Sequence, residues 1–447
     1  MTRIKFVNLY FTDLIGVFRN TSLLLSDEKD PSSVTTLFDG SSVYGFLDIS
    51  FSDVILKPVK ETEIVLPWDK NVYGYISQVY LPEWKRLDRD PRYIAEKAEE
   101  IIQSEGYRSV MGVEMEFFLF EKLKYIVEPG RQILEIYSAE SPWTDNASIP
   151  LKKGYHIVES IDRVAHIRRS IISALHEAGL NTVKHHHEVA SSGQVEITSN
   201  KENVVSLGDF IQYFKMIARK IARINGFEAV FMPKPIMGDN GNGMHIHVSL
   251  WSGDKNLFHD PDEKYGLSQF ARYFIGGLLE HGRSLSAIVS PTTNSYRRLI
   301  PGYEAPVYLV WGYANRSAAV RIPLANIDNG NMTRIEYRPP DPTANPYLAS
   351  SAIILAGLDG IKKKIDPGDP IEENVYKMPI EKRRSLGIRE LPRNLDEALD
   401  ELESDHEYLK PAFSEEVIQT YIELKRNEIR ELAGIPSPAE FLYYNLI

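Results

Sequence analysis

The first part of the chain shows short runs with the character of β-strands. Residues 4–11 alternate apolar and polar side chains with a period of two, which is typical of a half-buried strand. Two further short apolar runs have strand length, and they cover residues 54–56 and 72–76. The pattern predicts a small N-terminal domain built mainly of strands and turns.

A helical period begins after residue 90. Asp90 is a favourable N-cap, Pro91 suits the first turn, and Gly106 stands where a helix would end. The same period predicts further helices over residues 161–178, 207–224, 268–281, 346–364 and 413–433. We therefore place a domain boundary at about residue 90, giving an N-terminal domain of residues 1–90 and a second domain of residues 91–447.

The strands expected between these helices carry polar side chains on one face. In residues 111–120, Glu114 and Glu116 share a face because side chains two apart in a strand point the same way, and Met115 and Phe117 share the other. Two neighbouring carboxylates repel and lose hydration unless a cation compensates them. A sheet face open to solvent is the alternative, but the apolar neighbours favour a metal or another cationic partner.

Three other segments repeat this alternation. The polar sets are His245, His247 and Ser249 in residues 244–250, Arg334, Glu336 and Arg338 in residues 333–338, and Glu188 and Glu196 around a Ser-Ser-Gly turn in residues 185–197. Each segment alone has an ordinary explanation, namely a hydrogen-bonded histidine, a salt-bridged stripe, or a histidine run on the surface. Together they predict that the site binds more than one hard divalent cation, Mg²⁺ or Mn²⁺. The nearby arginines would then bind an anion carried by the metal, with a phosphoryl group the first candidate.

Composition narrows the chemistry further. The chain of 447 residues has no cysteine, so any metal must be held by oxygen and imidazole. Its 51 basic and 62 acidic residues leave a net charge of −11, which argues against a nucleic-acid partner. No run approaches the roughly 18 apolar residues of a membrane span, and Asp13 interrupts the N-terminus before a signal core develops. We expect a cytoplasmic protein with no membrane partner.

The glycine-rich segment 238–243 is not a common nucleotide motif. It lacks the P-loop lysine and the third glycine of a dinucleotide-binding turn, and it precedes an expected strand, not a helix. It is either a loop that brings backbone close to a small ligand or a plain turn.

A series of motifs in this chain resembles glutamine synthetase, in the same order along the sequence. They lie at residues 38–42, 114–120, 186–189, 193–196, 232–235, 238–247, 294–306, 315–317, 334–338 and 438–444. The resemblance, which is to the prokaryotic type I class, implies an α+β fold with a small N-terminal β-grasp domain. The larger catalytic α/β domain would carry a curved antiparallel sheet. It also implies a homo-oligomer, a dodecamer of two stacked hexamers with active sites between subunits.

The activity implied by the resemblance is the ATP-dependent ligation of ammonia to the γ-carboxylate of glutamate. The reaction would pass through γ-glutamyl phosphate and give glutamine, ADP and phosphate. ATP and two or more Mg²⁺ or Mn²⁺ ions would be needed at each site, and the partners would be glutamate, ammonium and ATP.

The resemblance also assigns roles to individual residues. One metal would be held by Glu116, Glu188 and Glu196, and the second by Glu114, His245 and Glu336. The nucleotide or the transferred phosphoryl group would contact His247, Ser249, Arg316, Arg321 and Arg334. Glutamate would be bound by Asn240, Gly241, Arg298 and Arg338, and ammonium by Asp39, Ser42, Tyr155 and Glu188. Direct parts in catalysis would fall to Asp39 as the base, Arg316, and Glu304 on a closing loop.

Two other functions remain open. A related ligase could join glutamate to a larger amine such as a polyamine, although the small anionic pair Asp39 and Ser42 favours ammonia. A non-catalytic structural or regulatory relative would have no need of all six metal ligands. The chain also departs from some relatives, with Asn331 in place of a lysine and Asp48 in place of a glutamine-sensing arginine, and Tyr376 is expected to be unmodified.

Overall fold

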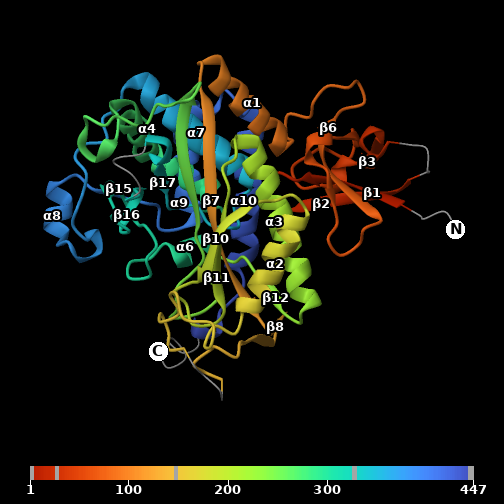
Figure 1. The fold of residues 1–447 in the computed structure, drawn as a ribbon, viewed down its shortest axis with the longest axis horizontal. Helices are drawn as coiled ribbons and strands as arrows, with labels where there is room; N and C mark the ends of the chain where they lie inside the picture. Colours follow the sequence, from red (N-terminus) through yellow and green to blue (C-terminus); the bar gives the residue numbers. More distant parts are fainter. Residues whose placement is uncertain (1–4, 26–29, 145–148, 325–329, 441–447) are drawn as a thin grey trace.

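The computed structural model describes residues 5–25, 30–144, 149–324 and 330–440. Residue 4 of the first predicted strand and residues 441–444 of the last motif lie outside this part. Two bodies stand side by side, an N-terminal sheet and a larger body of sheet and helices (Figure 1). No helix among the described residues is long and apolar enough to cross a membrane.

The N-terminal domain is a sheet in the order β2-β1-β6-β4-β3, with β5 paired to β6. Only β1 and β6 run parallel, and the other pairs are antiparallel. Val7, Leu9 and Phe11 alternate along β1 into the domain's own core, as the period of two predicts. The strands are β1 (Lys5–Thr12), β2 (Phe18–Leu25), β3 (Thr36–Asp39), β4 (Asp53–Pro58), β5 (Ile64–Val65) and β6 (Val72–Tyr80).

Buried and partly buried hydrogen bonds fix this domain against the rest of the chain. Asn345 donates to the carbonyl oxygen of Asp13 at 3.1 Å, and Gln212 donates to the hydroxyl of Thr12 at 3.0 Å. The hydroxyl of Tyr213 donates to a backbone carbonyl of the domain at 2.9 Å. With the domain held in this way, β3 lies on the side of the molecule away from β16 and β17 (Figure 1).

The second sheet runs in the order β10-β11-β7-β13-β17-β16-β15-β18. Its pairs are antiparallel except β15 and β16, which run parallel. Outside this path β12 pairs with β7 and β14 with β13, while β8 and β9 form a separate hairpin. The strands are β7 (Arg108–Phe120), β8 (Lys122–Glu128), β9 (Arg131–Tyr137), β10 (Thr182–His187), β11 (Gln194–Ser199), β12 (Glu228–Val230), β13 (Met244–Ser252), β14 (Lys255–Asn256), β15 (Tyr308–Tyr313), β16 (Ala318–Ile322), β17 (Ile335–Tyr337) and β18 (Arg389–Glu390).

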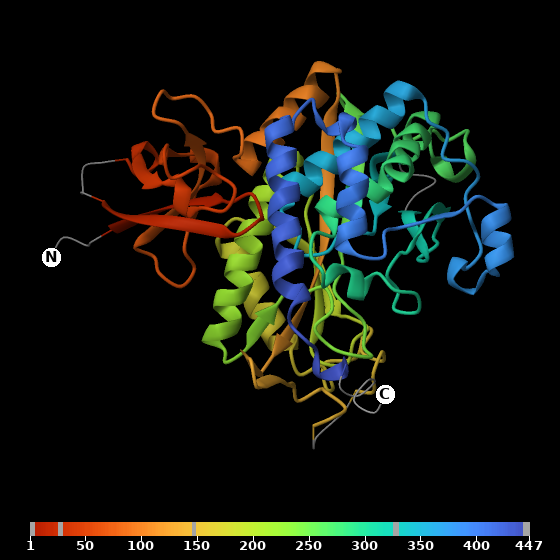
Figure 2. The same cartoon turned by 180° about the vertical axis from the view of Figure 1, so that it is seen from behind.

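Helices cover the apolar face of this sheet. Phe117 of β7 meets Phe214 of the long helix α3 edge to face, with ring centres 5.8 Å apart. Seen from behind, the blue helices of the C-terminal part lie in front of the sheet (Figure 2). The helices are α1 (Pro91–Ser104), α2 (Ala165–Glu177), α3 (Val204–Ile224), α4 (Gln269–Glu280), α5 (Gly282–Val289), α6 (Ser295–Arg298), α7 (Pro346–Lys363), α8 (Ile380–Ser385), α9 (Leu395–Ser404) and α10 (Glu415–Ala433). The other face of the sheet is thereby left for polar side chains.

The predicted helices are present, and their ends differ from the predicted ones by up to four residues. α2 begins at Ala165 and not at residue 161, because the preceding residues form turns. α3 begins at Val204, three residues before the predicted start, because Asn203 and Ser206 form a capping box there. The strand expected over residues 333–338 is confined to Ile335–Tyr337, so Arg334 and Arg338 flank it.

Candidate active site

The register of the second sheet places the predicted polar residues in one row. Glu196 of β11 lies opposite Glu116 of β7, and Glu114 of β7 lies opposite His245 of β13. Residues directly opposite in antiparallel strands have side chains on the same face. Four strands that are not consecutive along the chain therefore bring their polar faces together, and in the same row Glu336 of β17 lies opposite His247 and Arg321.

One group of potential metal ligands consists of Glu114, His245 and Glu336, whose ligand atoms all lie within 4.8 Å of one another. His245 Nδ1 is 3.2 Å from Glu114 and 3.7 Å from Glu336. Burial acts to raise the pKa of Glu114, but the adjacent His247 and His245 outweigh it and hold that pKa well below its usual value. Glu336 accepts from Arg321 and Arg338, and its pKa is lowered to about 2 against the effect of burial. Both carboxylates are therefore ionised and available to a cation.

A second group contains His186, Glu188 and Glu196, again within 4.8 Å of one another. Burial together with the charges of Glu116 and Glu196 raises the pKa of Glu188 well above its usual value. Burial also raises the pKa of Glu116, with Glu196 adding to the effect. Three buried carboxylates that repel one another in this way are the environment that a divalent cation relieves. The oxygen and imidazole donors of both groups suit Mg²⁺ or Mn²⁺.

A small polar cavity lies beside these groups, lined by Asn240, Gly241, Arg298, Arg338 and Glu304 together with the carboxylates of Glu114, Glu116, Glu188 and Glu196. Arg298 is buried and donates to the carbonyl oxygens of Pro339 at 2.7 Å and of Arg338 at 3.1 Å. The buried Oδ1 of Asn240 has no hydrogen-bond partner within the described part of the chain. An acceptor left free in this way is suited to a ligand that donates, such as an ammonium group.

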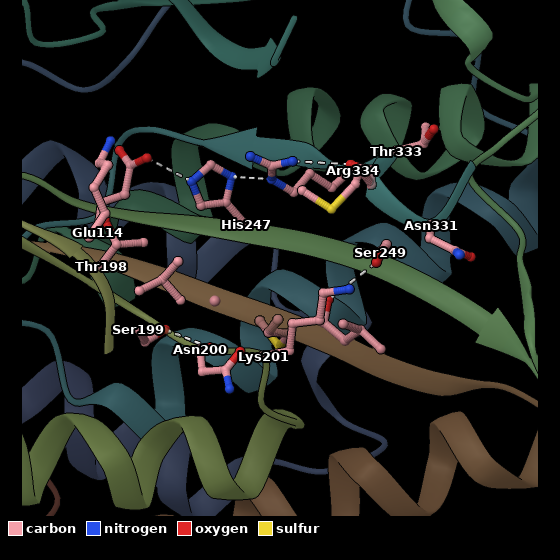
Figure 3. A pocket seen from close by; sticks show the side chains of 16 residues that line it. Glu114, Thr198, Ser199, Asn200, Lys201, His247, Ser249, Asn331, Thr333 and Arg334 are labelled. Carbon is pink, nitrogen blue, oxygen red and sulfur yellow. Dashed lines mark hydrogen bonds and ion pairs between the residues drawn. The ribbon is translucent and has the colours of Figure 1, made fainter. Parts of the chain in front are cut away.

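A larger cavity of about 350 Å³ adjoins the row on its other side. Figure 3 shows His247 between Glu114 and Arg334, with Ser249 further along β13. His247 Nε2 is 3.0 Å from the Glu114 carboxylate, and Arg334 Nε donates to His247 Nδ1 at 3.2 Å. The remaining walls carry apolar side chains, among them Val110, Met111, Val183 and Met332. The cavity thus combines an apolar wall with cationic groups at its inner end.

The predicted residues Tyr155 and Arg316 lie together, on a wide opening of about 720 Å³ that also contains Glu304. Asp39 and Ser42 are not part of any of these cavities. Asp39 is the last residue of β3 and Ser42 lies in the turn that follows, and the Asp39 carboxylate accepts from the hydroxyls of Ser41 and Ser42 at 2.6 Å and 2.7 Å. These hydrogen bonds lower the pKa of Asp39, which is exposed. Within a single chain the predicted ammonium pocket is therefore incomplete.

Three residues at the site have no role in the sequence-based prediction. His186 belongs to the second metal group, Gln194 donates to the Gly241 carbonyl oxygen at 2.9 Å, and Tyr303 lines the small cavity beside Glu304. His186 and Gln194 each stand two residues from a predicted ligand, so the strand period carries a signal for both. No such signal exists for Tyr303, which lies in a loop.

Comparison with protein families gives two matches that together span nearly the whole chain. Residues 3–82 match the glutamine synthetase β-grasp domain, and residues 88–444 match the glutamine synthetase catalytic domain. The expected fold class, a β-grasp domain followed by a catalytic domain of mixed α and β structure, is confirmed.

Individual relatives cover the chain from end to end. The chain is 49% identical to a glutamine synthetase of Sulfolobus acidocaldarius, over 99% of this chain and 95% of that protein. It is 41% identical to a glutamine synthetase of Thermotoga maritima, over 96% of this chain and 94% of that protein. Among solved structures, Plasmodium falciparum glutamine synthetase superposes with a TM-score of 0.88 at 29% identity, over 99% of this chain and 96% of the other. A GmaS/ADP complex superposes with a TM-score of 0.85 at 29% identity, over 99% of this chain and 97% of the other.

Proposed function

The chain belongs to the glutamine synthetase family, and we propose that it forms glutamine from glutamate and ammonia with the consumption of ATP. One observation carries the proposal most directly. Glu114 lines both the larger cavity of about 350 Å³ and the small polar cavity, so the two cavities meet at this metal-group carboxylate. A phosphoryl group can pass from ATP in the first cavity to glutamate in the second without leaving the site.

Two divalent cations are proposed to bind at this junction. Glu116, Glu188 and Glu196 would hold one, and Glu114, His245 and Glu336 would hold the other. His186 would stand beside the first, since it lies 3.2 Å from Glu196. When bound, the cations supply positive charge that binds phosphate oxygens and lowers the charge repulsion of phosphoryl transfer.

The phosphates of ATP are proposed to lie against His247, Ser249 and Arg334 at the inner end of the larger cavity. The Nε of Arg334 donates to Nδ1 of His247, and this hydrogen bond holds the guanidinium group beside the imidazole. Arg321 and Arg316 add positive charge from β16 and from the loop before it. Fixed guanidinium groups suit the charge that develops on the transferred phosphoryl group.

Glutamate is proposed to occupy the small cavity. Arg298 and Arg338 offer guanidinium groups to carboxylates, and Asn240 Oδ1 offers its free acceptor to the α-ammonium group, with Gly241 beside it. This orientation directs the γ-carboxylate toward the proposed metal positions. A carboxylate oxygen there bonds to the terminal phosphorus of ATP, the bond from that phosphorus to the β-phosphate oxygen breaks, and ADP leaves as γ-glutamyl phosphate is formed.

Ammonium is proposed to bind beside Tyr155 and Glu188, in a pocket completed by Asp39 and Ser42 from a neighbouring copy of the chain. The Asp39 carboxylate takes a proton from ammonium, because only the resulting ammonia has a lone pair for attack on the acyl phosphate. Glu304 covers the site during this step and excludes water. The exposed position of Asp39, on the side of the chain away from β16 and β17, supports an assembly with active sites between subunits, for which we propose a dodecamer of two stacked hexamers.

An amine panel tests the proposal. The purified chain is given Mg²⁺, ATP and glutamate, and phosphate release and glutamine formation are measured as each amine is added. We expect ammonium to support both. Turnover with a polyamine or another amine but not with ammonium would identify a different γ-glutamyl ligase, and no turnover with any amine would indicate a non-catalytic relative.

A further inference from the structure

Tyr303 precedes Glu304 in the loop between α6 and β15, and its ring is in contact with two lysine side chains. Lys152 Nζ is 3.7 Å and Lys234 Nζ is 3.8 Å from the centre of the ring. Cations are attracted to an aromatic face out to about 6 Å, so both contacts are close. Lys152 comes from the segment between β9 and α2 and Lys234 from the segment between β12 and β13. Tyr303 therefore joins two segments that are far apart in the sequence.

The backbone on both sides of Tyr303 has an unusual conformation. Gly302 has a φ of +92° and Glu304 a φ of +58°, which is the left-handed region that side chains disfavour. A residue such as Glu304 keeps this conformation only where surrounding contacts hold it. Lys152 Nζ donates to the Gly302 carbonyl oxygen at 3.2 Å, and the Tyr376 hydroxyl donates to the carbonyl oxygen of residue 305 at 2.6 Å. The loop is thus held at its centre as well as at its end.

Asp239 accepts hydrogen bonds from both lysines. Its buried carboxylate accepts from the Lys152 backbone N–H at 3.0 Å, and its backbone carbonyl accepts from Lys234 Nζ. The same carboxylate accepts from the backbone and hydroxyl of Ser191 at 2.8 Å and 2.7 Å. Asp239 also directly precedes Asn240 of the small cavity. The backbone of Lys152 and the ammonium group of Lys234 are therefore held by the residue that precedes the proposed glutamate subsite.

We propose that Lys152 and Lys234 are positioning residues that hold Tyr303, and with it Glu304, against the small cavity. The inference rests on the proposed function, because it concerns protection of γ-glutamyl phosphate from water. If the loop is displaced, a water oxygen bonds to the γ-carbonyl carbon, the bond from that carbon to the phosphate oxygen breaks, and a water proton passes to solvent. The products are glutamate and phosphate, so ATP is consumed without forming glutamine.

The coupling of ATP use to glutamine formation measures this role. In the full-length protein with Mg²⁺, ATP, glutamate and ammonium, ADP and glutamine are quantified in the same reaction. We expect one ADP for each glutamine in the unmodified chain, and a ratio higher by about 2-fold or more in Lys152→Met and in Lys234→Met. Methionine keeps the unbranched apolar stem and removes the charge. A lower concentration of active protein does not change the ratio, so a general loss of folded protein cannot imitate the effect.

Matched variants separate the cation–aromatic contact from other effects. Lys153→Met removes the same charge from an exposed neighbour and should leave the ratio unchanged. Lys152→Arg should keep the ratio of the unmodified chain, because arginine also binds an aromatic face. Tyr303→Phe keeps the aromatic ring and should keep the ratio, whereas Tyr303→Leu should raise it.

The inference is overturned if both methionine variants keep the unmodified ratio, or if Tyr303→Phe uncouples the reaction as strongly as Tyr303→Leu. If the methionine variants do not fold, the Tyr303→Leu and Tyr303→Phe pair decides by the same comparison. An unmodified chain that makes no glutamine contradicts the proposed function instead, so the two failures are distinguishable.

Discussion

Glu116 on β7 and Glu196 on β11 lie directly opposite each other in antiparallel strands, and both carboxylates are buried. Like charges in this position destabilise a sheet. Partial relief comes from the Gly243 backbone N–H, which donates to Glu116 at 2.7 Å, and from His186, 3.2 Å from Glu196. Such an arrangement lowers the stability of the metal-free protein and is relieved when a cation binds.

We predict that Glu196→Gln makes the metal-free protein more stable while it abolishes the activity. Removing one of the two opposed charges should raise the free energy of unfolding of the metal-free protein by about 1 kcal/mol and its thermal midpoint by a few degrees. Turnover should fall about 100-fold or more, because a metal ligand is lost. Thermal unfolding in EDTA measures the stability of the metal-free protein, and steady-state turnover measures the activity. Thermal unfolding in millimolar Mg²⁺ measures the response to the metal.

Added Mg²⁺ should raise the midpoint of the unmodified chain far more than that of Glu196→Gln, since a ligand that binds only the folded state stabilises it. Glu135→Gln, which changes an exposed carboxylate on the β8–β9 hairpin, serves as the control and should respond to Mg²⁺ like the unmodified chain. A less stable metal-free Glu196→Gln protein, or equal Mg²⁺ shifts in both chains, would contradict the prediction.

Asn256 is predicted to position Arg334 for nucleotide binding. Its buried Nδ2 donates to the carbonyl oxygens of Gly330 at 2.7 Å and Thr333 at 2.8 Å, directly before Arg334. Asn256→Ala leaves these buried acceptors without their donor and should raise KM for ATP about 10-fold, with KM for glutamate changed by less than about 2-fold. Lys255→Ala alters the exposed neighbour and should change neither. Equal increases in both KM values would exclude a local role at the nucleotide cavity.

The alternation of polar and apolar side chains contains much of the site. Glu114, Glu116 and His245 could be assigned to one face of their strands because the period of two is local information. Which strand lies beside which is not local, since the order β11-β7-β13-β17 follows from packing of the apolar faces against helices such as α3. The motif resemblance therefore assigns Glu114 and His245 to one metal. Only the structure shows that they lie directly opposite each other on β7 and β13.

Other elements do not follow from the sequence pattern in the same way. α9 is absent from the predicted helices, although Leu395, Ala398, Leu399 and Leu402 recur with the helical period after the N-cap Asn394. β15 is apolar on both faces, and a short run of that kind does not distinguish strand from helix. The contacts of Tyr303 with two lysines join three distant segments, and no pattern within one segment can contain them.

A buried histidine away from the active site gives a prediction about pH. His281 Nε2 lies 2.9 Å from Asp359 and Nδ1 lies 2.9 Å from Asp405, so both nitrogens face carboxylates. Lys363 also contacts Asp359 at 2.8 Å, and the Tyr408 ring stacks on the imidazole at 4.1 Å. Burial acts to lower the pKa of His281, but the hydrogen bonds to Asp405 and Asp359 outweigh it and raise the pKa above 6.5. The structure thus favours the imidazolium form.

Because this pKa is raised on folding, its contribution to stability is fully present below about pH 6.5 and is lost as the pH rises through the folded-state value. His281→Gln should therefore lower stability by about 1.5–3 kcal/mol near pH 6, and the difference from the unmodified chain should shrink at higher pH. Thermal unfolding across this range measures it, with the exposed His176→Gln as control. A difference that stays constant or widens with pH would exclude the charged form as its source.

Asp39 is predicted to act in the active site of a neighbouring chain. Asp39→Ala should reduce turnover about 100-fold or more while leaving ATP binding within about 2-fold, because a general base acts on ammonium and not on the nucleotide. Arg298→Ala should be inactive for a different reason, loss of glutamate binding.

If sites lie between subunits, random co-assembly of the two inactive chains pairs an intact Asp39 with an intact Arg298 in about one quarter of the sites. Co-expression in equal amounts should then restore about a quarter of the activity, which separately purified proteins show only after their subunits exchange. Activity no greater than the sum of the two variants would instead place Asp39 in the site of its own chain.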